Sequence, residues 1–240
     1  GKVETIHAKV QVKEKGLEKY LVYDDYRRTS LREHLMPPHA TLADYQGGKL
    51  TEQGDFIDSP YDIKIGRENH TLSLEFSRVG ELSSPQGEKS PVQINKKVLI
   101  LKGEPALYLE YYIENLGEKE VAFNFAPEFN FALQAGHDAQ RFYAIPGEDL
   151  VERNLASIGE HQELEELYLV DEFNGFKIRV QMGTPAKVWR FPIETISQSE
   201  GGIERIYQSS VVMPLWSLNI KPGEREQKRV LIAIKEIEGK

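Results

Sequence analysis

The chain of 240 residues contains no cysteine. This absence excludes disulfide bonds, thiolate zinc sites and cysteine nucleophiles together. It fits a cytoplasmic protein in a reducing compartment, and it also fits many extracellular proteins. The absence of cysteine therefore limits the possible chemistry of the chain, but it does not identify the cellular compartment.

Long hydrophobic runs and basic surface are also scarce. No stretch approaches the roughly 18 apolar residues of a membrane span, and the N-terminal residues alternate between apolar and charged types, so we expect neither a signal peptide nor a membrane partner. The net charge of −8 argues against a nucleic-acid partner, because phosphate binding needs a basic surface.

The common catalytic signatures are missing as well. The sequence has no P-loop, no dinucleotide-binding glycine motif after a strand, no nucleophile elbow and no zinc-protease helix motif. None of the six histidines has a second histidine four residues away, so a metal site would have to assemble across strands. We predict no metal, no cofactor and no catalytic residue in this chain. The 38 carboxylates allow many glycosidase-like pairs, and none of these pairs is distinguished from the others.

Alternation with a period of two recurs along the chain, and it is typical of half-buried strands. Turn residues separate the alternating runs, which begin at Ile6, Leu72, Leu107, Val121, Phe176 and Val230. Only residues 30–35 and 150–167 have a composition that could form a short helix. The pattern predicts an all-β, antiparallel two-sheet sandwich that forms one domain over residues 1–240. Two smaller sandwiches are the alternative, although no linker composition supports a boundary.

Three turns are expected between these strands. Asn174-Gly175 is typical of a two-residue type I′ hairpin, in which both residues have positive φ. Residues 115–118 are expected to form a second hairpin. Lys221-Pro222-Gly223-Glu224 has proline and glycine where a type II turn requires them.

The first segment with a concentration of charge is 23–35, in which acidic and basic side chains alternate with aromatics. Arginine and aspartate side chains can form bidentate, charge-assisted hydrogen bonds, which suit either a salt-bridged corner between strands or a docking surface. We therefore name the candidate domain-interface residues as Asp24, Asp25, Arg27, Arg28 and His34.

The second segment is 121–138, in which phenylalanines occupy odd positions and polar residues occupy even positions. Unless Pro127 introduces a bulge, one face of this strand is apolar and the other carries Asn124, Glu128 and Asn130. Amides and carboxylates can hold sugar hydroxyls, so these three residues are candidate carbohydrate ligands, with His137 at the rim. A satisfied polar network beneath a covering loop is the alternative.

Three stretches resemble the C-terminal domain of glycoside hydrolase family 57 α-amylases and 4-α-glucanotransferases. They are YDDYRRTSLREHLMP with LADYQ (42–46), FAPEFNFAL, and the stretch 189–224. The resemblance runs from about Tyr20 to the end of the chain. Its most specific positions are Trp189, Pro192, Thr195, Ser197, Ser199, Glu200, Gly202, Glu204, Tyr207, Gln208, Pro214 and Trp216.

This resemblance implies a large sandwich like that of galactose mutarotase, which in the full enzyme follows a catalytic barrel. The family's catalytic residues lie in that barrel, and this sequence lacks the alternating strands and helices of a barrel. The implied partners are the N-terminal catalytic barrel and α-glucan oligosaccharides or starch. The implied function is a non-catalytic accessory domain; an autonomous carbohydrate-binding module and a mutarotase-like sugar enzyme are the alternatives.

Both tryptophans lie in strand-like runs, and tryptophan usually contributes to a core. We therefore expect Trp189 and Trp216 to be mainly structural, with Trp216 also a candidate for stacking on a sugar.

Overall fold

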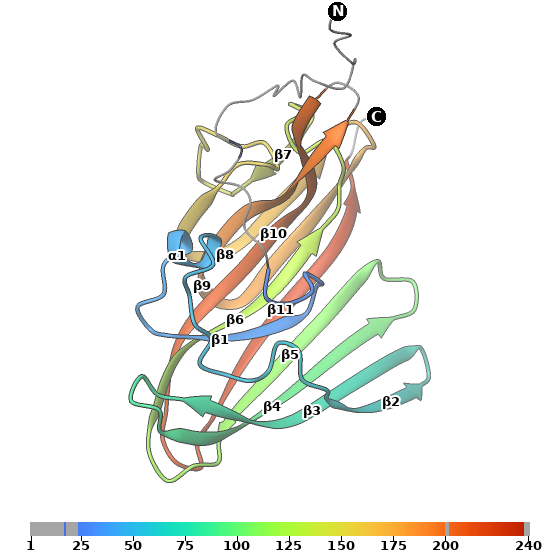
Figure 1. Cartoon of the computed structure of the whole chain (residues 1–240). Helices are drawn as coiled ribbons and strands as arrows, with labels where there is room; N and C mark the ends of the chain where they lie inside the picture. Colours follow the sequence, from blue (N-terminus) through green and yellow to red (C-terminus); the bar gives the residue numbers. More distant parts are fainter. Residues whose placement is uncertain (1–16, 18–23, 200–201, 238–240) are drawn as a thin grey trace, which may run out of the picture.

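A computed structural model describes residue 17 and residues 24–199 and 202–237. These residues form eleven β-strands and one short α-helix (Figure 1). The expected all-β class is therefore confirmed. The alternating run that begins at Ile6 lies outside the described residues. No helix in the described part of the chain is long and apolar enough to cross a membrane.

The strands all belong to one antiparallel sheet, in the order β1-β6-β10-β9-β11-β5-β4-β3-β2, with β8 beside β9 and β7 beside β8. The elements of the first half are β1 (Arg32–Met36), α1 (Leu42–Gln46), β2 (Asp62–Glu68), β3 (Thr71–Ser83), β4 (Lys89–Leu101) and β5 (Ala106–Asn115). Those of the second half are β6 (Val121–Phe131), β7 (Arg141–Ala144), β8 (Gly159–Asp171), β9 (Phe176–Ser199), β10 (Gly202–Ile220) and β11 (Arg225–Glu236).

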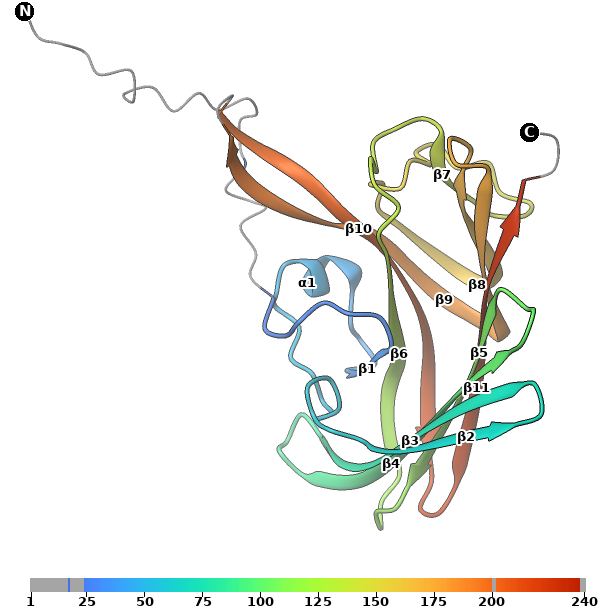
Figure 2. The ribbon, with the colours of Figure 1, turned by 90° about the vertical axis from the view of Figure 1, so that its right-hand side faces the viewer.

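Strand β9 folds this sheet into two layers. Residues 176–182 of β9 pair with β11, whereas residues 187–199 pair with β10. Gly183 lies at the change of partner, where an added Cβ would be 3.0 Å from that of Arg229, too close for an ordinary side chain. The layer of β1, β6 and β10 therefore packs against the layer of β11, β5, β4, β3 and β2, as Figure 2 shows.

The core lies between the two layers and contains the odd-numbered phenylalanines of β6. Phe123, Phe125 and Phe129 are buried, and Phe125 contacts Tyr111 edge-on from the opposite layer. Trp216 belongs to this core, and Trp189 is buried in a second hydrophobic cluster with Leu42 and Tyr45 of α1, which confirms that both tryptophans have a structural role. The alternation in the sequence therefore identified the inward face of this strand correctly.

Both helical expectations were wrong. Residues 32–36 form β1, which pairs with β6 along its whole length, and residues 159–171 form β8. The helix occurs instead at Leu42–Gln46, where the Thr41 side chain accepts a hydrogen bond from the Asp44 backbone NH. Pairing with neighbouring strands outweighs local helix propensity in the two mispredicted segments.

Two of the three turns differ from expectation. Asp171 pairs with Phe176, so the hairpin loop has four residues, and Gly175 is its one residue with positive φ (76°). This geometry is not type I′. Residues 115–118 form no hairpin, because β5 pairs with β4 and β11 while β6 pairs with β1 and β10. Residues 115–118 instead connect the two layers of the sheet.

The third turn was predicted correctly. Gly223 has φ 72°, and the Glu224 NH donates to the Lys221 carbonyl. This turn also crosses between the layers, next to the first crossing. The buried Asn115 joins the two, because its side chain donates to the Ile220 carbonyl and its own carbonyl accepts from Gly223 NH.

Candidate functional site

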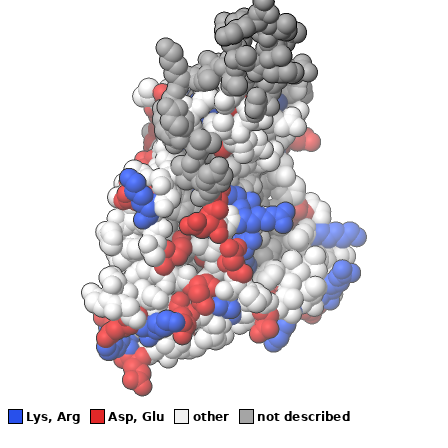
Figure 3. All heavy atoms as spheres, viewed as in Figure 1, with Lys and Arg blue, Asp and Glu red and all other residues white. Residues whose placement is uncertain are grey.

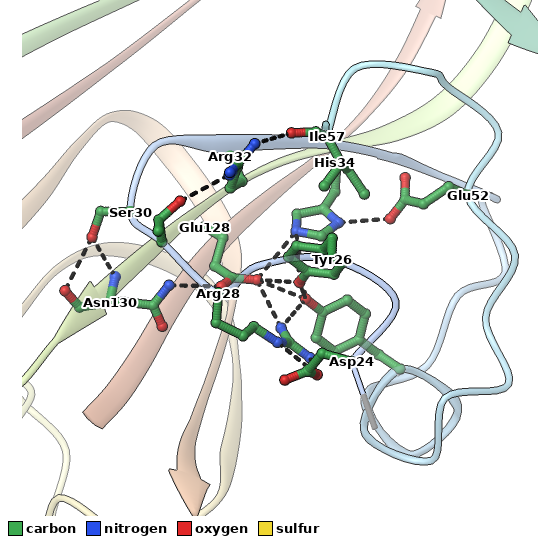
Figure 4. Close-up of polar contacts among 12 residues, drawn as sticks. Asp24, Tyr26, Arg28, Ser30, Arg32, His34, Glu52, Ile57, Glu128 and Asn130 are labelled. Atoms are coloured by element: carbon green, nitrogen blue, oxygen red, sulfur yellow. Dashed lines mark hydrogen bonds and ion pairs between the residues drawn. The ribbon is translucent and has the colours of Figure 1, made fainter. Parts of the chain in front are cut away.

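Glu128 is the centre of a polar cluster on the outward face of β6. The side chain is completely buried, because residues 24–59 cover this face of the strand. Its Oε2 accepts hydrogen bonds from Tyr26 Oη at 2.6 Å, Tyr45 Oη at 2.8 Å and Arg28 Nη1 at 2.8 Å, and its Oε1 accepts one from Asn130 Nδ2 at 2.7 Å (Figure 4). We call these residues, together with His34 and Glu52, the Glu128 network.

His34 joins two carboxylates within the Glu128 network. Its Nδ1 is 2.6 Å from Glu52 Oε1, and its Nε2 is 3.2 Å from Glu128 Oε2. Burial alone disfavours the charge on this ring, but Glu52 and Glu128 outweigh that effect and raise the pKa of His34 to about 9. His34 is therefore an imidazolium at neutral pH, with both ring nitrogens donating.

Glu128, Tyr26 and Tyr45 are also held in one protonation state. Burial disfavours the charge on Glu128, but His34 and Arg28 outweigh it and hold the pKa of this carboxyl well below its usual range. Burial and the nearby Glu128 charge raise the pKa of Tyr26 and of Tyr45, so both phenols remain neutral donors. A general acid or base needs a pKa near the working pH, which Glu128, His34 and the two phenols do not have.

A pocket of about 570 Å³ adjoins the network, and Tyr26, Arg28, Tyr45 and Glu52 contribute to its wall. Its charged lining is mostly acidic, with the carboxylates of Asp24, Asp25, Glu52, Asp55 and Asp58 against the cations of Arg28 and Lys49. Figure 3 shows acidic side chains gathered on this face of the molecule. Among the described residues, no three His, Asp or Glu side chains lie close enough together to hold a metal ion.

The polar stripe on β6 is present, but it does not face solvent. The pairing of β6 with β1 runs from Asn124 to Glu128 without a shift, so Pro127 introduces no bulge. Asn124 is 6% exposed, donates to the Pro37 and Pro38 carbonyls, and accepts from Ser217 Oγ. Asn124 and Glu128 therefore match the alternative of a satisfied network under a covering segment, whereas the buried Asn130 Oδ1 has no hydrogen-bond partner among the described residues. A role for the stripe in sugar binding stays a prediction.

Two candidate sugar ligands lie away from the Glu128 network. His137 is exposed and lies 3.2 Å from Glu194 Oε1 on β9. Trp216 is 6% exposed, stacks on Phe125 and donates through Nε1 to the Thr184 carbonyl, so its ring offers a sugar almost no surface.

The candidate interface residues divide between the network and the surface. Arg28 and His34 belong to the network, and Asp24 forms an ion pair of 2.7 Å with Arg28. Asp25 and Arg27 are exposed. His34 is completely buried, so it can act on a partner only by positioning its neighbours.

Sequence reasoning did not assign a role to three members of the network. Tyr26 lies inside the charged segment and Tyr45 inside LADYQ, so both were within stretches already noted. No sequence pattern pointed to Glu52, because its contact with His34 is formed only by the tertiary structure. Aromatic residues flanking a run of paired charges were the usable signal for the two tyrosines.

Replacing Arg28 should destabilise the fold strongly. In Arg28→Met the buried Glu128 carboxylate keeps its charge but loses its guanidinium partner, so we expect a loss of about 3–5 kcal/mol in the free energy of unfolding. Arg27→Met is the matched control, because Arg27 is exposed, and should cost less than about 1 kcal/mol. Urea denaturation of both variants measures the difference, and equal losses would contradict the assigned role of Arg28.

Stability should fall as the pH rises above neutrality. The folded pKa of His34, about 9, lies above the ordinary value of 6.5, so its contribution is complete below pH 6.5 and is lost as the pH rises to about 9. The full loss is about 3 kcal/mol. Urea denaturation across this range should show the slope in the native chain and a reduced slope in His34→Gln.

His161 provides the control for that measurement. Burial, with Arg190 beside it, lowers the pKa of His161, so its contribution is present above pH 6.5 and is lost as the pH falls below that value. His161→Gln should therefore leave the alkaline slope unchanged. An alkaline slope that persists in His34→Gln would show that another group titrates there.

Comparison with known proteins places this fold in a family. A family model described as "Alpha-amylase/4-alpha-glucanotransferase, C-terminal" matches residues 1–229. Alpha-amylase 1 of Dictyoglomus thermophilum is 26% identical over 222 residues, which are 92% of this chain and 30% of the relative. The 4-alpha-glucanotransferase of Thermococcus litoralis is 29% identical over 192 residues, which are 80% of this chain and 25% of the relative.

Solved structures agree with these matches. The crystal structure of the Thermococcus litoralis 4-alpha-glucanotransferase superposes with a TM-score of 0.70 and 25% identity, over 95% of this chain and 30% of that one. A galactose mutarotase-like protein from Clostridium acetobutylicum has a TM-score of 0.55 and 11% identity, over 86% of this chain and 79% of that one, which confirms the mutarotase-like fold alone. The chain spans about 25–30% of the two curated relatives. It belongs to the family of α-amylase/4-α-glucanotransferase C-terminal domains.

Proposed function

We propose that this chain is the non-catalytic C-terminal domain of a longer α-glucan-active enzyme, an α-amylase or a 4-α-glucanotransferase, and that it packs on the catalytic barrel of that enzyme. The family match over residues 1–229 carries this proposal. The two curated relatives are named as such enzymes, and each is about three times as long as this chain.

The Glu128 network supports a structural role rather than catalysis. Glu128 is surrounded by donors from Tyr26, Arg28, His34 and Tyr45, which leaves Oε2 with no free direction toward a substrate. At neutral pH Glu128 is ionised and His34 is protonated, because the pKa of Glu128 lies well below 7 and that of His34 lies above 7. A mutarotase-like sugar enzyme would need a group in this cluster that exchanges protons readily.

The acidic pocket supports a docking role for the surface beside the network. Asp24, Asp25, Asp55 and Asp58 are exposed around it. Arg28, Arg78 and Arg32 form ion pairs with Asp24, Asp55 and Asp58, and these pairs hold the carboxylates in place. Charged side chains held in fixed positions help to orient a partner whose charges are complementary. In the proposed enzyme, the partner that docks on this surface is the catalytic barrel.

The native polypeptide should be much longer than this chain. An antibody raised against the purified chain should detect, in an extract of the source cells, a single polypeptide about three times as long, as in the relatives. Mass spectrometry of the captured polypeptide would give peptides from a barrel domain. A native polypeptide of 240 residues would contradict the proposal.

The isolated chain should not act on α-glucans. Purified protein incubated with soluble starch or maltoheptaose should release no reducing sugar and should form no longer oligosaccharides, because the proposed catalytic residues lie outside these residues. Glu128→Gln is the control for contamination. Activity that disappears in Glu128→Gln would make this chain an enzyme in its own right.

A further inference from the structure

A groove of about 380 Å³ lies on the outer face of the layer formed by β2, β3, β4 and β5. It shares no lining residue with the acidic pocket. The side chains on its floor point away from the core, because they alternate with inward-facing residues such as Phe76 and Tyr111. The groove is therefore a second concave surface, separate from the Glu128 network.

Strand register builds the floor from two rows of polar side chains. One row crosses the four strands through Asp62, Ser77, Asn95 and Tyr112, which are paired in register. The next row, two residues along each strand, crosses through Lys64, Glu75, Lys97 and Glu110. Neighbouring side chains within a row are about 4.7–4.9 Å apart across the sheet.

The charges of this groove are balanced. Lys97 lies 3.2 Å from Glu75, and Arg229 on β11 lies 3.3 Å from Glu110. Lys64 and Asp62 on the rim carry one charge of each sign, so the floor and rim together have no excess charge. Such a surface favours neither a phosphate nor a cation, and it suits a neutral ligand with many hydrogen-bonding groups.

The first row has hydrogen-bonding capacity that the protein leaves unused. Among the described residues, the half-buried Asn95 amide has no hydrogen-bond partner, although it can donate two bonds and accept two. Ser77 Oγ accepts from Gln93 Nε2 at 3.3 Å, which leaves the hydroxyl proton of Ser77 available to a ligand. Asn95 lies between Ser77 and Tyr112 in the row, so these free groups are adjacent.

Tyr112 adds an aromatic surface at the end of the row. Its hydroxyl donates to Glu110 Oε2 at 3.3 Å and accepts from Gln227 Nε2 at 2.9 Å, and the Arg225 guanidinium lies 5.0 Å from the ring centroid. These contacts hold the ring in one orientation. A pyranose has an apolar face of C–H bonds and a rim of hydroxyls, so it fits an aromatic ring next to an amide and a carboxylate.

We propose that this groove binds a neutral glucan chain, with Asn95, Ser77 and Asp62 hydrogen-bonding sugar hydroxyls and Tyr112 packing on a pyranose face. The choice of α-1,4-glucan among neutral oligosaccharides rests on the proposed function. The groove would hold a glucan strand on the surface of the domain, apart from the surface that docks on the catalytic barrel.

Titration of the ¹⁵N-labelled chain with maltoheptaose, followed through the backbone amide shifts, tests this proposal. We expect shifts confined to residues 62–64, 75–77, 95–97 and 110–112. Asn95→Ala should raise the Kd about fivefold or more, since it removes hydrogen bonds to the sugar. Asn219→Ala is the matched control, because Asn219 is an exposed asparagine on β10 outside the groove, and its Kd should equal that of the native chain.

Tyr112→Leu gives a second test, because it replaces the aromatic ring by an aliphatic side chain and should also weaken binding, with circular dichroism to confirm folding. Three results would overturn the proposal: no shifts at millimolar maltoheptaose, shifts centred on residues 24–59, or an unchanged Kd in Asn95→Ala. Cellohexaose binding as tightly as maltoheptaose would overturn the assignment to α-glucan. None of these results would alter the length of the native polypeptide, so the proposed function is tested separately.

Discussion

The buried charge of Glu128 is the constraint on which the covering segment depends. A carboxylate in a protein interior is tolerated only when its charge and hydrogen-bonding capacity are satisfied. Its partners outside β6 come from three places along the chain: Tyr26 and Arg28 before β1, His34 on β1, and Tyr45 on α1. The requirement to satisfy one carboxylate therefore holds β1, α1 and the residues before them against β6.

Strand β1 connects the Glu128 network to the opposite layer of the sheet. Successive residues of a strand face opposite sides, so Glu33 points toward the interior while His34 points toward the covering segment. Glu33 is buried, forms an ion pair of 2.7 Å with Lys96 on β4, and accepts a hydrogen bond from Tyr61 at 3.0 Å. A strand of five residues thus joins the Glu128 network to the layer whose outer face carries the groove.

The same fold can support different functions because function depends on the site built on it. In this chain, the outward face of β6 is covered by a charge network in which His34 and Glu128 have fixed protonation states, and the lining of the adjoining pocket has more acidic than basic side chains. The groove on β2 to β5 differs in character, because its floor consists of two rows of polar side chains in register, and its central amide makes no hydrogen bond within the part of the chain that the structure describes. The two surfaces have no lining residue in common, so the proposed docking on the barrel and the proposed glucan binding use separate parts of the domain.

The sequence by itself determined the fold class, the inward face of β6 and the family. These features can be predicted because alternation and local motifs depend only on residues that are close together in the sequence. It also showed that Glu128 and Asn130 share a face, and it placed Arg28 and His34 among the charged candidates. Only the tertiary structure decided that the face is covered, that residues 32–36 form a strand, and that Glu52 pairs with His34. These features depend on contacts between residues far apart in the chain, such as the 94 positions that separate His34 from Glu128, and no local pattern records such contacts. The groove is decided in the same way, since Asn95 and Tyr112 become neighbours only through the register of β4 with β5.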